Sequence, residues 1–101
     1  MDNFNGLTPA QAERLALLCE EMGEAQQAIG KILRHGYESR HPDGGPTNRE
    51  ALEKEVADVF VAAKMMFKVD DLCVENAVKH EAEKIVAVQK YLHHQSPGAS
   101  Q

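Results

Sequence analysis

Apolar residues recur three or four positions apart in the first third of the chain, which is the spacing of one face of an α-helix. The series consists of Leu15, Leu18, Met22, Ala25, Ile29 and Ile32. Thr8 supplies a capping hydroxyl, Pro9 suits the first helical position, and Gln11 completes a capping box. Together these features predict a helix over about residues 8–35.

Two further helices are predicted beyond a long loop. Residues 36–48, GYESRHPDGGPTN, are dense in Gly, Pro, Asp and Ser, which is loop composition. A second capping box, Thr47 to Glu50, opens a helix that should end near Val69. Asp70 or Asp71 can cap a third helix. The apolar positions of the last two helices are Leu52, Val56, Val59, Ala63 and Met66, then Val74, Val78, Ile85, Val88 and Leu92. No strand pattern is evident, so the expected class is all-α, with three main helices and a long loop after the first.

Length and charge narrow the class of protein. With 101 residues, of which 43% are apolar, the chain should form one domain over residues 1–92 and a flexible tail over residues 93–101. A formal net charge of -5 offers no basic stripe, which disfavours nucleic acid as the main partner. The absence of a membrane-length apolar run or a secretion signal, and two cysteines that suit reduced thiols, favour a soluble cytoplasmic protein without a membrane partner.

Two pairs of acidic residues flank the predicted apolar faces. Glu21 and Glu24 border the face of the first helix, and Glu55 and Asp58 border that of the second. If the two helices pack antiparallel, four carboxylates converge. Like charges in contact repel unless a cation offsets them, and an all-oxygen set suits Mg²⁺, with Mn²⁺ as a possible substitute. The alternative is that these acids are solvated groups on helix surfaces.

The same acids carry a resemblance to a known family. Glu20-Glu21-Met22-Gly23-Glu24 followed by Glu55-Val56-Ala57-Asp58 resembles the EExxE and ExxD motifs of the MazG-like all-α nucleoside triphosphate pyrophosphohydrolases. The resemblance spans about residues 10–92, and residues 33–52 are particularly similar to small stand-alone members from phages and bacteria. It implies Mg²⁺-dependent cleavage of a nucleoside triphosphate into the monophosphate and pyrophosphate, as house-cleaning of the nucleotide pool. A deoxynucleotide is the expected substrate, and the preferred base and sugar stay open.

The resemblance also implies roles for individual residues. Glu21, Glu24, Glu55 and Asp58 would be the metal ligands, with Glu20 as a supporting acid. A carboxylate free of direct ligation, Glu20 or Glu24, could orient the attacking water or accept its proton. The candidates for substrate contacts are Lys31, Arg34, Lys79 and Lys84 for the phosphates and Tyr37 for the base or sugar. After Lys84 the chain has Ile85 and Val86 where relatives often have Asn and Arg, which leaves the phosphate contacts open.

Three helices of this size leave apolar surface uncovered. We therefore expect a homo-oligomer, a dimer or a tetramer, in which hairpins pair into a four-helix-bundle core near the site. Gly23 and Gly30 lie seven apart in the first predicted helix, where close approach of another backbone, or neutral drift, would explain them. Two other functions are open: a non-catalytic helical interaction or regulatory module, and a phosphoribosyl-ATP pyrophosphohydrolase.

Overall fold

A computed structural model describes residues 4–95 of the chain as helices joined by loops. In chain order the elements are η1 (Phe4–Gly6), α1 (Pro9–His35), α2 (Asn48–Lys68), α3 (Val74–Ala87) and η2 (Val88–Tyr91). No strand occurs among these residues beyond one isolated antiparallel bridge, between Arg40 and Thr47. The all-α class with three main helices and a long first loop is therefore confirmed. Of the predicted tail, the residues after 95 lie outside the described part of the chain.

Both predicted capping boxes are present. The Thr8 hydroxyl accepts from the Gln11 N–H at 3.1 Å, and the Gln11 side chain accepts from the Thr8 N–H at 2.9 Å. At α2 the Thr47 hydroxyl accepts from the Glu50 N–H at 3.1 Å, and the Glu50 carboxylate accepts from the Thr47 N–H at 2.9 Å. The pKa of Glu50 is lowered, because the hydrogen bonds that its carboxylate accepts from Thr47 stabilise the ionised form.

The prediction that Asp70 or Asp71 caps the third helix is wrong. Cys73 occupies the N-cap of α3, and its side chain makes no capping hydrogen bond. The Asp71 carboxylate is instead engaged by Arg14, whose Nε and Nη2 donate to it at 2.6 and 3.2 Å. Asp70 adopts a left-handed backbone conformation with φ of 61°. The side chain of Asp71, which the local sequence predicts as a cap, thus forms a tertiary ion pair with Arg14 instead.

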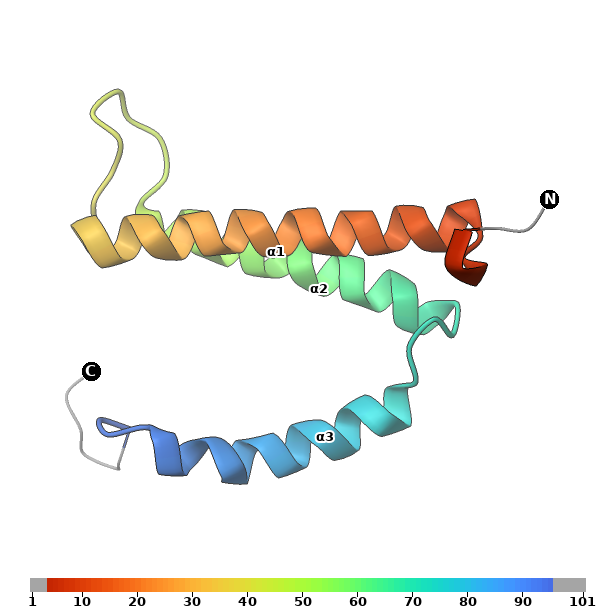
Figure 1. The fold of residues 1–101 in the computed structure, drawn as a ribbon. Helices are drawn as coiled ribbons and strands as arrows, with labels where there is room; N and C mark the ends of the chain where they lie inside the picture. Colours follow the sequence, from red (N-terminus) through yellow and green to blue (C-terminus); the bar gives the residue numbers. More distant parts are fainter. Residues whose placement is uncertain (1–3, 96–101) are drawn as a thin grey trace. The chain divides into compact units, whose positions relative to one another are not determined.

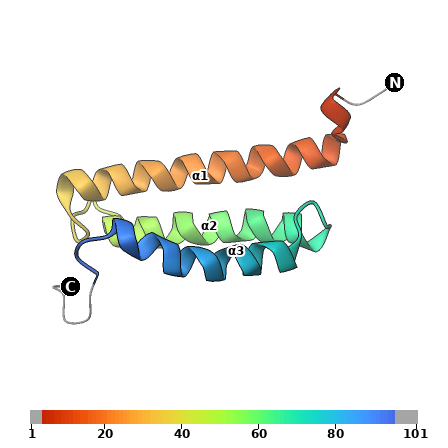
Figure 2. The same ribbon diagram turned by 60° about the horizontal axis from the view of Figure 1, so that its bottom comes forward.

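The first compact unit, which ends at Asp71, is a hairpin of two helices. α1 and α2 lie side by side and run in opposite directions, and the loop between them extends from one end of the pair (Figure 1, Figure 2). The seam between the helices buries Ala28, Ala62 and Met66, with exposed fractions of 7%, 1% and 2%. Alanines on both helices allow the two backbones to approach closely.

The seam lies along one edge of the apolar face predicted for α1, of which Leu18, Ala25 and Ile32 are partly buried. Met22 remains 51% exposed and Leu15 and Ile29 are exposed as well, whereas the line from Glu21 through Glu24 to Ala28 is partly or fully buried. One partner helix covers only part of a wide apolar stripe, and here it covers the edge that carries the acids. The other edge of the stripe, with Leu15, Met22 and Ile29, stays at the surface of the hairpin.

The second compact unit begins at Leu72 and contains α3 and η2. None of the residues of these two helices is fully buried. Most of its large apolar side chains are exposed; these are Leu72, Val74, Val78, Ile85, Val86, Tyr91 and Leu92. In the part of the chain that the structure describes, no helix is both long and apolar enough to cross a membrane.

Candidate functional site

Four carboxylates meet at the middle of the hairpin. Glu21 and Glu24 come from α1, Glu55 and Asp58 come from α2, and one ligand oxygen of each lies within 4.8 Å of those of the other three. Each pair is three residues apart, so both members point toward the facing helix from successive turns. The structure therefore brings together all four residues that the sequence put forward as metal ligands, although their role as ligands stays a prediction.

The acidic cluster is partly buried and lacks internal compensation. One carboxylate oxygen of Glu21 and one of Glu55, the Oε2 atom in each case, are buried without a hydrogen-bond partner. The pKa of Glu21 is raised, first because burial disfavours its charged form and then because Glu24 and Asp58 carry like charges. Buried acceptors without donors are costly, so this arrangement suits a bound cation. The oxygen-only donor set fits a hard divalent ion such as Mg²⁺ or Mn²⁺.

Lys54 is a neighbour of the cluster that the sequence reasoning missed. Its Nζ lies 2.7 Å from Asp58 Oδ2 and 3.6 Å from Glu55 Oε1. These contacts raise the pKa of Lys54, chiefly through the hydrogen bond to Asp58. The i, i+4 spacing of Lys54 and Asp58 was the available signal. This ammonium group is largely exposed, and it offsets only one of the four charges.

Glu20 does not belong to the converging set. It is exposed, and it acts on the cluster as a nearby negative charge that contributes to the raised pKa of Glu21. Glu24, the other predicted catalytic acid, lies inside the cluster. The structure thus separates the two candidates by position: one is a ligand candidate, and the other is a solvated acid beside it.

Lys31 and Arg34 lie on the loop side of the acids. Lys31 and Glu24 both line a cavity of about 270 Å³ between the two helices, and Gln27 and Asn48 line it as well. Arg34 lines an adjoining cavity of about 490 Å³ under the loop, and Lys31 borders this cavity too. Asn48, which the sequence reasoning did not single out, borders both cavities.

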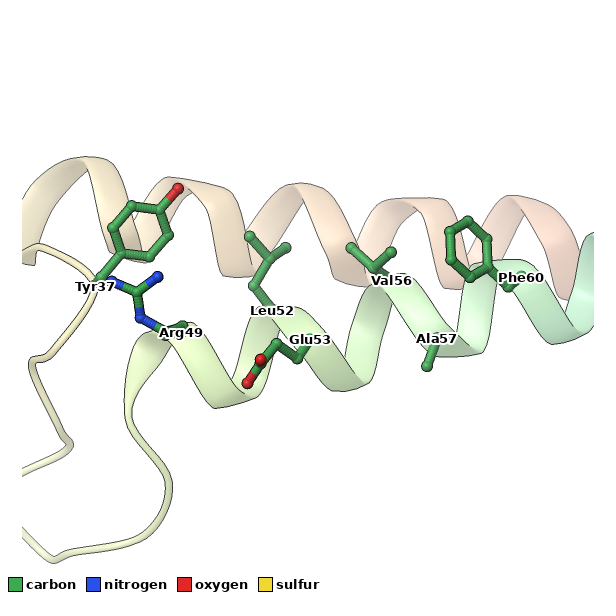
Figure 3. Close-up of a pocket in the computed structure, with 7 residues that line it drawn as sticks. All are labelled: Tyr37, Arg49, Leu52, Glu53, Val56, Ala57 and Phe60. Atoms are coloured by element: carbon green, nitrogen blue, oxygen red, sulfur yellow. The ribbon is translucent and has the colours of Figure 1, made fainter. Parts of the chain in front are cut away.

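Tyr37 lies in a different place from these two cations. It lines a groove of about 420 Å³ on α2 that is otherwise largely apolar and reaches Phe60 (Figure 3). The Arg49 guanidinium stacks 4.2 Å from the centre of the Tyr37 ring, and Glu38 holds the guanidinium at 2.8 Å. One ring face of Tyr37 is therefore already covered by Arg49, a partner that the sequence reasoning missed because the loop conformation creates the contact.

Lys79 and Lys84 are exposed residues of α3, in the second compact unit. Their predicted contact with phosphate stays a prediction.

Comparisons of the chain with protein-family models, with curated proteins and with solved structures gave no match. The family assignment therefore rests on the two acidic motifs and their order along the chain, and it stays a prediction. The convergence of the four carboxylates does not depend on any relative, because it is seen in the structure of this chain.

Proposed function

We propose that this protein is a Mg²⁺-dependent nucleoside triphosphate pyrophosphohydrolase of the MazG-like type. The observation that carries the proposal is the convergence of Glu21, Glu24, Glu55 and Asp58 within 4.8 Å, with two buried carboxylate oxygens that have no hydrogen-bond partner. Four acids with only Lys54 to offset their charge oppose folding, whereas four acids around a divalent cation form a binding site. The motif resemblance supplies the reaction.

The reaction adds water across the bond between the α- and β-phosphates, which gives the nucleoside monophosphate and pyrophosphate. Glu21, Glu24, Glu55 and Asp58 would hold Mg²⁺, or Mn²⁺ in its place. When bound, the metal neutralises phosphate charge and polarises phosphorus toward the attacking water. Whichever of Glu20 and Glu24 is free of direct ligation to the metal would accept the proton of the water or orient it. Lys31, with Arg34 beyond it, offers charge-assisted hydrogen bonds to phosphate oxygens.

A homo-oligomer is part of the proposal. The face of the hairpin that α1 and α2 leave uncovered carries large exposed apolar side chains, among them Met22 and Ile29 on α1 and Phe60 on α2. Apolar surface of this kind favours association with a second copy. Two hairpins that pair through these faces give a four-helix core, as a dimer or within a tetramer.

The same exposed apolar residues favour the second candidate function, a non-catalytic helical interaction module. A panel assay separates the two. The purified protein is incubated with each of the eight common ribo- and deoxyribonucleoside triphosphates, and with phosphoribosyl-ATP, in Mg²⁺ or Mn²⁺, and released pyrophosphate is measured. We expect release from at least one deoxynucleotide. Activity on phosphoribosyl-ATP alone would select that enzyme instead, and no release from any substrate would overturn the enzymatic function.

Asp58→Asn is the matched test of the site in this assay, with Glu13→Gln, an exposed acid of α1 outside the cluster, as the control. We expect Asp58→Asn to lower kcat/KM by at least about a hundredfold, because a ligand of the metal is lost. Glu13→Gln should retain the activity of the natural protein. Equal activity of both variants would show that the cluster has no part in the reaction.

A further inference from the structure

An open cavity lined by basic side chains lies under the loop between α1 and α2. The cavity measures about 490 Å³, and its lining includes Lys31, Arg34, His35, Arg40 and His41. Three of these side chains, those of Lys31, Arg34 and Arg40, are positively charged at neutral pH. The chain as a whole has a net charge of -5, so the positive lining of this cavity is opposite in sign to the net charge of the chain. Such a cavity attracts anions.

The loop around the cavity has a defined conformation. Arg40 Nη1 donates to the Gly45 carbonyl at 2.8 Å, and the Asn48 side chain donates to the Gly36 carbonyl at 3.1 Å. Gly44 and Gly45 have φ values of 96° and 102°, a region that favours glycine. These contacts shape the cavity before any ligand binds, which reduces the cost of ordering on binding.

Each of the carboxylates nearest to the loop has a partner of its own, and the partner of Asp43 is the cavity residue His41. Glu50 closes the capping box of α2, Glu38 is paired with Arg49, and Asp43 lies 3.6 Å from His41 with an almost fully exposed side chain. Among the described residues that line the cavity there is no Asp or Glu. The first N–H groups of α2 are also taken, because those of Asn48 and Arg49 donate to loop carbonyls at 2.9 Å. An anion here would be held by side chains.

The basic cavity adjoins the space beside the acids. The two cavities share Lys31, Asn48 and Ala51, and the one of about 270 Å³ is also bordered by Glu24 and Glu55 of the acidic cluster. Helical side chains lean toward the N-terminus of their helix, so Lys31 and Arg34 lean from the loop end toward the acids. The two cavities together are lined first by carboxylates and then by cations. This order suits a polyphosphate of which one phosphate is bound to the metal and the following phosphates are not.

We propose that the basic loop cavity binds the terminal phosphates of a polyphosphate, so that the pyrophosphate product lies under the loop and the nucleoside extends in the opposite direction along the hairpin. This inference rests on the proposed function, since the metal site fixes which phosphate lies at the acids. It also places the nucleobase away from Tyr37, which lines the separate groove on α2.

The test is binding of inorganic tripolyphosphate, measured by titration calorimetry in EDTA at low salt. The variants are Lys31→Ala/Arg34→Ala and, because Arg40 also holds the loop, Arg40→Ala separately. The matched control is Lys64→Ala/Lys68→Ala, which removes two exposed cations from α2 outside the cavity. We expect the natural protein and the control to bind, and the first variant to bind at least about tenfold more weakly, the effect of losing charge-assisted hydrogen bonds. No binding by the natural protein, or equal binding by all, overturns the inference.

The experiments distinguish failure of the inference about the basic loop cavity from failure of the proposed function. Pyrophosphate release that needs Asp58, together with equal tripolyphosphate affinity in Lys31→Ala/Arg34→Ala and the natural protein, would leave the enzyme standing and remove the loop cavity from its site. Tripolyphosphate binding that needs Lys31 and Arg34, with no turnover of any nucleotide, would establish the anion site and overturn the enzymatic function.

Discussion

Glu21 bears the clearest electrostatic cost in the hairpin. Its carboxylate has one buried oxygen without a hydrogen-bond donor, and burial together with the charges of Glu24 and Asp58 raises its pKa. A carboxyl whose pKa is higher in the folded than in the unfolded protein binds its proton more tightly when folded. In the metal-free protein, stability is therefore lost as the pH rises from the ordinary pKa of glutamate through the raised pKa of Glu21.

This gives a prediction for Glu21→Gln. The variant cannot ionise at this position, so the free energy of unfolding of the natural protein should fall relative to that of the variant as the pH rises, with no difference in slope well above the raised pKa. Urea unfolding of both proteins in EDTA, from about pH 4 to about pH 8, measures the difference and cancels the opposite trends of Asp71 and Glu50, whose pKa values are lowered. Parallel curves over the whole range would show that Glu21 ionises freely.

At the residue scale, the converging acids could be predicted because their spacing fixes which helix face they occupy. Glu21, Glu24, Glu55 and Asp58 meet when the two helices pack antiparallel through the edges that carry these acids, and the chain forms such a pair. The stacking of Arg49 on Tyr37 could not be predicted, because it depends on loop backbone geometry that has no periodic signal. Lys54 could have been found, since its i, i+4 relation to Asp58 is visible in the sequence.

At the scale of elements, local signals were sufficient for the starts of α1 and α2 and insufficient for α3. Capping boxes are closed within four residues, so Thr8 and Thr47 act as predicted. The start of α3 was mispredicted because Asp71 is bound by Arg14, 57 residues away in the chain. The rotation of α1 could not be predicted either, because its apolar stripe is wider than one helix contact and either edge could have been buried.

The glycine inside α1 at position 23 gives a prediction about the stability of this helix. Apart from its chain neighbours and the nearby backbone of α1, a Cβ atom added at Gly23 would meet no atom within 4 Å, so no close approach of α2 requires glycine there. Gly23→Ala should therefore stabilise the protein by about 1 kcal/mol, the difference in helix propensity. Gly36→Ala is the contrasting control, since φ of 87° disfavours alanine and should make that variant less stable. Thermal unfolding measures both, and a destabilised Gly23→Ala would point to contact with a second copy.

At the scale of the whole molecule, the distribution of apolar side chains predicts self-association. The natural protein should have a mass in light scattering of at least twice the 11.2 kDa of one chain. Phe60 is 58% exposed in the groove of α2, so Phe60→Asp should shift the mass toward that of the monomer, because burying an unpaired charge is costly. Asn76→Asp adds the same charge at an exposed polar position and should leave the mass unchanged. A monomeric natural protein would contradict the four-helix core.

The most direct test of the four-carboxylate site is thermal unfolding of the natural protein and of Glu24→Gln, each in EDTA and in Mg²⁺. Without metal, Glu24→Gln should be more stable by about 1 kcal/mol, because one screened repulsive charge is removed. Mg²⁺ at a hundredfold excess over its dissociation constant should stabilise the natural protein by about 2.7 kcal/mol and the variant by much less. Equal stability of the two proteins in EDTA, together with equal shifts in Mg²⁺, would contradict a metal site built from these acids.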